Sequence, residues 1–408
     1  MANRNYVCVT IYDFDMGGTP TYWFRMLTWA KGNGYAPYLM VHKRRSISKR
    51  WEQRLKEENI EIVRFDLKYG GICFDSNLQI AAKFITEETL FVTAELHCYI
   101  NLKQYSINAK FAKCILYILH PLATQICGWR IVNNIYKRVL KADCNEGVIF
   151  MDEETFYSYK KYYGDEIYNE HYFRLGNYVS PIDYKSLHKR NVSRHDKFKI
   201  LTVSRFEFPF KGYLLGMLNS LKNVSFPNDY ELIIVGNGPN YDDFVDAMNV
   251  LEDDIVRHIK LVGEVDYTLL GKYYSEASAY VGMGTTLLEA SQNGVPSIVA
   301  SAFQIGEKST GFLFDSRYNL GGNSNIESSS VTTISECLQK VVKSSYQEYQ
   351  EMAESCYEVN FVDYNLDDVM EKVLKVHTNT TKHRVLCVIN TLIVKAKIYV
   401  QEQRKIGN

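Results

Sequence analysis

The stretch that decides the fold is residues 274–301, YSEASAYVGMGTTLLEASQNGVPSIVAS. A short apolar run at 277–281 leads into a glycine-bounded turn at 282–284, and a helix is predicted from Thr285. Gly-Val-Pro at 294–296 ends that helix. A strand that passes through glycines into a helix N-terminus favours an anion, because free N–H groups and the helix dipole point to one place. Glu289, one turn into the helix, is placed to accept hydrogen bonds from hydroxyls beside that anion, and a nucleotide-sugar combines both groups.

The composition is that of a globular protein with two domains. The chain has 408 residues, 46% of them hydrophobic, and its 47 lysines and arginines balance 47 aspartates and glutamates. No global field therefore favours nucleic acid. Nine scattered cysteines indicate reduced thiols in a cytoplasmic protein. The N-terminus reads as a strand and not as a signal peptide, and no apolar run approaches the roughly 20 residues of a membrane span.

Strand-like runs alternate with helical stretches along the whole chain, which predicts parallel sheets covered by helices. The expected strands are 6–11, 36–41, 60–64, 90–93, 113–119 and 147–150 in the first half, then 198–203, 231–235, 259–261, 278–281 and 297–299. Glycine, proline and charge between about 175 and 197 predict a linker. Two doubly wound domains would each bind ligands at the carboxyl ends of their strands.

The stretch 274–301 resembles the second half of the retaining glycosyltransferases of family 4, which have the two-domain GT-B fold. There an acid, a glycine, an aromatic residue and a glycine are followed by a second acid, eight positions after the first. Glu289 matches the second acid, whereas Val281 stands at the first. The resemblance implies two Rossmann-like domains facing a central cleft. Residues 1–180 would bind the acceptor, 196–361 the nucleotide-sugar, and 362–408 would form helices returning to the first domain.

A second signal lies directly after the predicted strand 198–203. Arg205 ends this strand, and Lys211 follows six residues later, before Gly212 and a predicted helix. Two cations at a strand end can neutralise a departing diphosphate. The family has an arginine and a lysine at these places, so the resemblance implies that role for Arg205 and Lys211.

The first half offers weaker signals. Gly17 and Gly18 lie between the first strand and a predicted helix, and glycines let the backbone approach a ligand closely. In the family a glycine pair here lies over the donor phosphates and the acceptor. His120 ends the strand 113–119 and matches a family histidine that contacts the donor sugar; His97, after the strand 90–93, is the alternative.

Two loops in the second half are candidates for contact with the nucleotide base. Gly236 begins Gly-Asn-Gly-Pro after the strand 231–235, but Tyr241 takes the third glycine position of a dinucleotide fingerprint, which argues against a dehydrogenase. In the family a similar loop lies near the base. The backbone of Val262, Gly263 and Val265 would read the base edge.

The resemblance implies a retaining hexosyl- or deoxyhexosyltransferase that needs neither metal nor cofactor. A nucleoside diphosphate sugar would donate to an acceptor hydroxyl, and the leaving phosphate would take the acceptor's proton. Arg205, Lys211 and the N–H groups of Gly284, Thr285 and Thr286 would stabilise the diphosphate. Acceptors would be glycans or lipid-linked glycans in cell-surface polysaccharide or glycolipid synthesis. The acid pair Asp13 and Asp15 is interpreted as accidental and not as a metal site.

Several alternatives stay open. Val281 cannot accept a hydrogen bond, so either the donor is an unusual sugar such as a deoxy sugar, or the chain is a non-catalytic GT-B subunit that partners an active enzyme. An epimerase or phosphorylase of similar architecture is a further rival. The basic run 42–50 is either a solvated surface or a contact to anionic lipids on the inner face of the membrane. Residues 385–394, flanked by basic residues, either return to the first domain or lie on the membrane.

Overall fold

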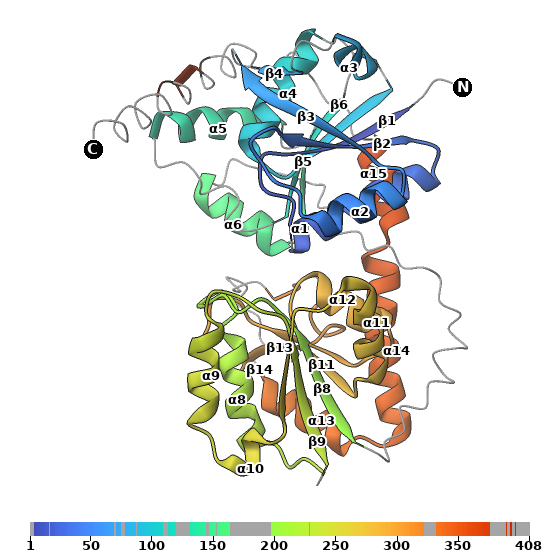
Figure 1. Ribbon diagram of the computed structural model, residues 1–408. Coiled ribbons are helices and arrows are strands. Elements are labelled where there is room, and N and C mark those ends of the chain that lie inside the picture. The colour runs from blue at the N-terminus through green and yellow to red at the C-terminus, as the bar shows by residue number, and fades with distance from the viewer. Residues whose placement is uncertain are drawn as a thin grey trace. The chain divides into compact units, whose positions relative to one another are not determined.

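The chain divides into two compact units, which are described separately (Figure 1). Unit 1 comprises Met1–Leu175 and Asp368–Asn408, and unit 2 comprises Gly176–Asp367. The computed structural model describes residues 4–15, 17–68, 71–74, 78–86, 88–108, 113–119, 130–143, 147–151, 153–163, 197–227, 229–317, 319–321, 332–375, 389, 392, 393 and 396.

Unit 1 contains a seven-stranded sheet in the order β4-β3-β2-β1-β5-β6-β7. The strands are β1 (Asn5–Thr10), β2 (Ala36–His42), β3 (Glu61–Lys68), β4 (Gly71–Cys73), β5 (Thr89–Thr93), β6 (Lys113–Ile118) and β7 (Val148–Phe150). All neighbouring strands are parallel except β3 and β4, which are antiparallel. Strands β1 and β5 are buried along their whole length, as expected for a sheet covered on both faces.

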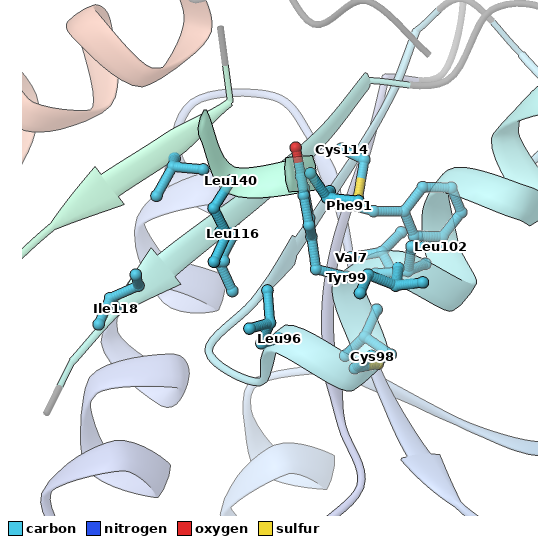
Figure 2. Close-up of a cluster of buried hydrophobic side chains, with 14 of the residues drawn as sticks. Val7, Phe91, Leu96, Cys98, Tyr99, Leu102, Cys114, Leu116, Ile118 and Leu140 are labelled. Atoms are coloured by element: carbon cyan, nitrogen blue, oxygen red, sulfur yellow. The ribbon is translucent and has the colours of Figure 1, made fainter. Parts of the chain in front are cut away.

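Helices connect these strands and bury the faces of the sheet. They are α1 (Gly18–Gly32), α2 (Lys49–Glu57), α3 (Leu78–Lys83), α4 (Leu96–Asn108), α5 (Arg130–Asp143) and α6 (Glu153–Tyr163). Figure 2 shows Tyr99 and Leu102 of α4 in one cluster with Phe91 of β5 and Leu116 of β6. Each of these side chains is at most 1% exposed, so the cluster forms the core of unit 1.

A segment from the far end of the chain packs into unit 1 as well, against Tyr6 of β1. Helix α15 (Leu366–Lys375) carries Met370, which is fully buried. The hydroxyl of Tyr6 on β1 lies 3.8 Å from the Met370 sulfur, and Lys113 Nζ donates to the carbonyl of Leu374 at 3.4 Å. Residues on both sides of unit 2 in the sequence thus pack together in unit 1.

Unit 2 contains a second seven-stranded sheet in the order β10-β9-β8-β11-β12-β13-β14. Its strands are β8 (Phe198–Val203), β9 (Tyr230–Val235), β10 (Ile259–Gly263), β11 (Ala279–Gly282), β12 (Ser297–Ala300), β13 (Lys308–Phe312) and β14 (Thr332–Thr333). Strands β10, β9, β8, β11 and β12 are parallel, whereas β13 and β14 add an antiparallel edge.

Two layers of helices cover the sheet of unit 2. The helices are α8 (Tyr213–Asn223), α9 (Tyr241–Asn249), α10 (Asp253–Val256), α11 (Tyr267–Glu276), α12 (Thr285–Gln292), α13 (Ile334–Lys343) and α14 (Tyr346–Asp363). Helix α8 packs against α9 and α13, and α12 packs against α14. In Figure 1, α8 and α9 lie on the left of the sheet and α11, α12 and α14 on the right.

The structure confirms the α/β fold class, and each strand expected from the sequence has a counterpart. The strands without a counterpart among the expected ones are the short antiparallel strands β4, β13 and β14. The helix that opens after the glycine turn begins at Thr285 and ends at Gln292, before Gly294, as expected. The predicted linker between about 175 and 197 lies almost wholly outside the described residues.

Candidate functional site

The strand order of unit 2 puts its topological switch point between β8 and β11. The chain passes from β8 outward to β9 and β10, then returns to the other side of β8 with β11. Open α/β sheets bind ligands at such a switch point, in the crevice outside the carboxyl ends of the strands. Arg205 follows β8 and the turn at 282–284 follows β11, so both strong sequence signals lie at this edge.

The turn after β11 is held in a conformation that requires glycine. Gly284 has φ +69°, in the left-handed region, and is the N-cap residue of α12. Its N–H donates to the carbonyl of Leu320 at 2.7 Å. This corrects the expected anion contact, because the N–H of Gly284 is already used. The N–H groups of Thr285 and Thr286 are in the first turn of α12, where a helix has no internal acceptor for them.

The side chain of Thr286 fixes the turn rather than facing a ligand. Its hydroxyl accepts a hydrogen bond from Tyr280 at 2.7 Å and donates to the carbonyl of Met283 at 3.2 Å. Tyr280 is fully buried, and its burial raises the pKa of its phenol well above the usual value. Tyr280 therefore stays a hydrogen-bond donor at physiological pH, and the backbone N–H is what Thr286 can offer an anion.

Glu289 lies in the second turn of α12 and is 6% exposed. Its Oε2 accepts a hydrogen bond from the hydroxyl of Tyr274 on α11 at 2.9 Å. Tyr274 is buried too, and burial followed by the charge of Glu289 raises the pKa of its phenol. Val281 is 0% exposed within the central strand β11. The apolar edge of a deoxy sugar would therefore find no exposed surface of Val281 to contact.

Arg205 and Lys211 both lie in the segment that joins β8 to α8. The side chain of Arg205 is 65% exposed, and its nearest acid is Glu207, with Nε and Oε2 3.9 Å apart. Lys211 is half-buried, and its ammonium lies 4.6 Å from the centre of the Phe210 ring. Burial lowers the pKa of Lys211 to about 8, although Glu207 opposes the shift. Two cations therefore follow the carboxyl end of β8, one largely exposed to solvent and one half-buried.

Gly236 has a packing role that the sequence did not reveal. A Cβ there would lie 1.9 Å from the carbonyl oxygen of Ser204, so only glycine allows the loop after β9 to reach the loop after β8. The N–H of Gly236 donates to the carbonyl of Gly263 at 2.8 Å. Close approach of backbone to backbone, and not to a phosphate, accounts for this glycine in the structure.

The other base-contact candidates lie at the end of β10. Val262 and Gly263 are its last two residues, and Val265 follows in the loop before α11. These three residues share the carboxyl edge of the sheet with Arg205. The structure thus brings the unit 2 candidates to one edge, in the order β10, β9, β8, β11.

The switch point of unit 1 lies between β1 and β5. Gly17 is the N-cap residue of α1 and Gly18 its first residue, so both follow β1 at this edge. Glu95 follows β5 and is 5% exposed. Its Oε1 accepts from the Thr10 hydroxyl at 2.9 Å and its Oε2 from the Thr93 hydroxyl at 2.7 Å. Burial raises the pKa of Glu95 to about 7, and this acid was missed because the sequence analysis weighed only the neighbouring histidine.

The two histidine candidates have different outcomes. His120 lies outside the described residues. His97 lies in the first turn of α4, and burial lowers its pKa to about 4, so its imidazole is neutral at physiological pH. Asp13, one of the two acids interpreted as accidental, accepts hydrogen bonds from the N–H and the hydroxyl of Ser46 at 2.8 and 3.0 Å.

Two negative findings apply to the described residues alone. No group of three or more histidine, cysteine or acidic side chains is arranged there to hold a metal ion. Within the same ranges, no helix combines the length and the hydrophobicity that crossing a bilayer requires.

Residues 197–320 match the family model described as Glycosyl transferases group 1. This part of unit 2 is therefore similar to the group 1 glycosyltransferases. The match contains Arg205, Lys211 and the complete α12, so it includes the edge described above. No curated protein matches the chain.

Solved structures match both units of the chain. A glycosyltransferase from Rickettsia africae has a TM-score of 0.61 at 14% identity, over 93% of this chain and 99% of that one. HepE of Anabaena, in complex with UDP and glucose, has 0.57 at 14%, over 91% and 99%. TarM of S. aureus, a point mutant in complex with UDP, fondaparinux and a GlcNAc-glycerol, has 0.59 at 12%, over 92% and 99%. The chain therefore has the GT-B fold.

Proposed function

We propose that the chain transfers a hexosyl or deoxyhexosyl group from a nucleoside diphosphate sugar to an acceptor hydroxyl, with retention of the anomeric configuration. The observation that carries this proposal is the edge between β8 and β11 in unit 2. There Arg205 and Lys211, in the segment after β8, and the N-terminus of α12, after β11, supply positive charge from two segments of the chain. A diphosphate is the anion that such a site suits.

In the proposed reaction the protein's main task is electrostatic. The bond between the anomeric carbon and the β-phosphate oxygen breaks, and a bond to the acceptor oxygen forms on the same face. The acceptor's proton passes to the departing phosphate. Arg205, Lys211 and the N–H groups of Thr285 and Thr286 stabilise the charge that develops on the diphosphate. Glu289 accepts hydrogen bonds from ribose hydroxyls, while Gly236, Val262, Gly263 and Val265 line the base.

The charge of these groups replaces that of a metal ion, so we propose that activity persists in EDTA. Structures similar to this chain contain UDP, which makes UDP the first diphosphate to test. In unit 1, Gly17, Gly18 and His120 are proposed to face the acceptor and the donor sugar. A glycan or lipid-linked glycan is the proposed acceptor, in the synthesis of a cell-surface polysaccharide or glycolipid.

The decisive experiment removes the two cations. Arg205→Ala and Lys211→Ala are each expected to lower kcat/KM about 100-fold or more, because losing one preorganised contact to the charge of the transition state typically slows a reaction by about that factor. UDP binding, measured by calorimetry, is expected to weaken as well. Product analysis by NMR tests retention through the configuration at the anomeric carbon.

A matched control removes the same charge elsewhere in unit 2. Arg257 and Lys222 are exposed, before the start of β10 and in the last turn of α8. Arg257→Ala combined with Lys222→Ala should leave UDP affinity and turnover within about twofold of wild type. If the Arg205 and Lys211 variants behave like this control, the proposed diphosphate site is wrong.

We further propose that the enzyme acts at the inner face of an anionic membrane. The basic run 42–50 supports this, although Lys43 pairs with Asp66 at 2.7 Å and Arg45 with Asp13 at 3.6 Å. Salt-dependent pelleting with anionic liposomes is the expected result. Equal recovery with neutral liposomes would count against the idea.

The second candidate is a non-catalytic GT-B subunit that binds a partner glycosyltransferase. Val281, which replaces the first acid of the family pattern and is fully buried, is the observation in its favour. A panel of nucleotide sugars separates the two functions. Diphosphate binding with neither transfer nor hydrolysis for any donor would favour the subunit.

A further inference from the structure

The connection between β12 and β13 lies against the segment that carries Lys211. Phe303, in this connection, donates its N–H to the carbonyl of Phe210 at 3.1 Å. The Phe303 and Phe210 rings pack with their centres 4.9 Å apart. The Lys211 ammonium lies over the same Phe210 ring, 4.6 Å from its centre. A continuous chain of contacts therefore runs from Phe303 through Phe210 to the ammonium.

The backbone of Phe303 is in an uncommon conformation. Its φ is +57°, in the left-handed region that bulky side chains rarely occupy. Such conformations persist where the surroundings over-determine them, and they gather at functional sites. Here the residue in this conformation makes both the hydrogen bond to Phe210 and the ring contact.

Two glycines allow the connection to lie this close to α8. A Cβ on Gly212 would lie 2.6 Å from the carbonyl oxygen of Gln304, and a Cβ on Gly216 would lie 1.9 Å from that of Gly306. The residues after Phe303 are therefore fixed against the same turn and helix that follow Lys211. The connection therefore contacts the segment both at Phe210, before Lys211, and at Gly212 and Gly216, after it.

We propose that Phe303 is a positioning residue, which holds the Lys211 ammonium at the diphosphate by fixing the ring of Phe210. This inference rests on the proposed function, since it assigns Lys211 to the diphosphate. A ring face attracts a cation, and a fixed ring limits the rotamers of the lysine that it carries. The contact also keeps water from one side of the ammonium.

Charge near Lys211 gives the proposal a measurable signature. Burial lowers the pKa of Lys211 to about 8, and the charge of Glu207 shifts it in the opposite direction. Glu207 lies near Arg205, with Nε and Oε2 3.9 Å apart. Loosening the Phe210 ring would admit water to the ammonium and raise this pKa towards that of an exposed lysine.

The test measures UDP affinity by calorimetry between pH 7 and 10, with the full chain. In wild type, affinity should fall above about pH 8 as Lys211 loses its proton. Phe303→Gly, which suits the positive φ, should weaken binding about tenfold at pH 7 and move the alkaline fall upward by a measurable fraction of a pH unit. Phe303→Tyr, which keeps the ring, should resemble wild type, and Phe303→Leu should lie between them.

Two further variants separate positioning from general destabilisation. Phe226 stacks on Tyr230 with ring centres 4.5 Å apart, before β9 at the opposite end of the sheet. Phe226→Leu should lower the melting temperature without changing UDP affinity or its pH dependence. In a Lys211→Met background, Phe303→Gly and Phe303→Leu should have no further effect on affinity, because the group that they position is gone.

The outcomes distinguish this inference from the proposed function. If Lys211→Met weakens binding but Phe303→Gly and Phe303→Leu change neither affinity nor the alkaline fall, only the positioning role is overturned. Equal losses from the Phe303 variants in both Lys211 backgrounds would also overturn it. If wild type binds no nucleoside diphosphate, the proposed function fails and the inference with it.

Discussion

Removing the Tyr274 hydroxyl tests whether Glu289 is held as a buried carboxylate. Tyr274 is 2% and Glu289 6% exposed, and their oxygens are 2.9 Å apart. A hydrogen bond to a charged group contributes about 1.5–3 kcal/mol, and water cannot replace this one without entering the fold. Tyr274→Phe should therefore lower the free energy of unfolding of unit 2 by about 2 kcal/mol.

The assay uses the distribution of tryptophan. The four tryptophans are residues 23, 29, 51 and 129, all of them in unit 1, so their fluorescence reports on that unit, whereas far-UV circular dichroism reports on both. Tyr274→Phe should shift the guanidinium transition seen by circular dichroism more than the one seen by fluorescence. The variant should also weaken UDP binding, because Glu289 would lose the contact that orients it.

The control is the same change one residue earlier. Tyr273→Phe removes a hydroxyl that makes no hydrogen bond with any residue in the described ranges, and it should stay within about 0.5 kcal/mol of wild type. In a Glu289→Gln background, Tyr274→Phe should cost only about 1 kcal/mol, since the acceptor is then neutral. Equal unfolding transitions for Tyr274→Phe and Tyr273→Phe would refute the reasoning.

Three further changes have expected effects on stability. The raised pKa of Glu95 means that folded unit 1 keeps a proton that the unfolded chain releases between pH 4.5 and about 7, so the free energy of unfolding of the wild type falls as the pH rises through that window. Relative to wild type, the free energy of unfolding of Glu95→Gln, followed by tryptophan fluorescence, should therefore increase by up to roughly 3 kcal/mol between pH 4.5 and 8. A difference between the two proteins that does not change with pH would contradict this. Lys103 and Asp143 form an ion pair with side chains 4% and 2% exposed, so Lys103→Met should cost about 3–5 kcal/mol in urea unfolding and the further change Asp143→Leu should restore much of it. Gly216→Ala should lower the free energy of unfolding of unit 2, measured by circular dichroism, by about 1–3 kcal/mol, because the added Cβ would meet the carbonyl of Gly306. This loss should outweigh the better helix propensity of alanine. A stabilised variant would show that the connection after β12 can move away from α8.

The parallel core of each unit was predictable because buried strands appear in the sequence as apolar runs of characteristic length. Strands β13 and β14 were not, since KSTGF and TT carry little hydrophobic signal and pair only at an antiparallel edge. The packing role of Gly236 was not predictable either. Its loop was expected near the nucleotide base, and its close approach to the carbonyl of Ser204 depends on tertiary packing that no sequence signal marks.

The supporting residues of the site were the least predictable. Nothing in the sequence marks the positive φ of Phe303, because the residue type disfavours it and only the tertiary contacts impose it. Tyr274 stands inside the stretch 274–301, yet its contact with Glu289 depends on how α11 packs against α12. Glu95 had a usable signal, an acid directly after an apolar strand, and its partners Thr10 and Thr93 end the two strands at the switch point.

The return of the chain to unit 1 has a consequence for biosynthesis. Tyr6 of β1 shares its buried surroundings with Met370, 364 residues later in the chain, so during translation β1 waits for α15 before this side of its core is closed. Unit 2 is continuous in the sequence and is the first unit whose residues are all available. A nascent chain stalled before residue 366 would contain every strand of the second sheet but would lack α15, so we expect unit 1 to be the part that exposes apolar surface longest during translation.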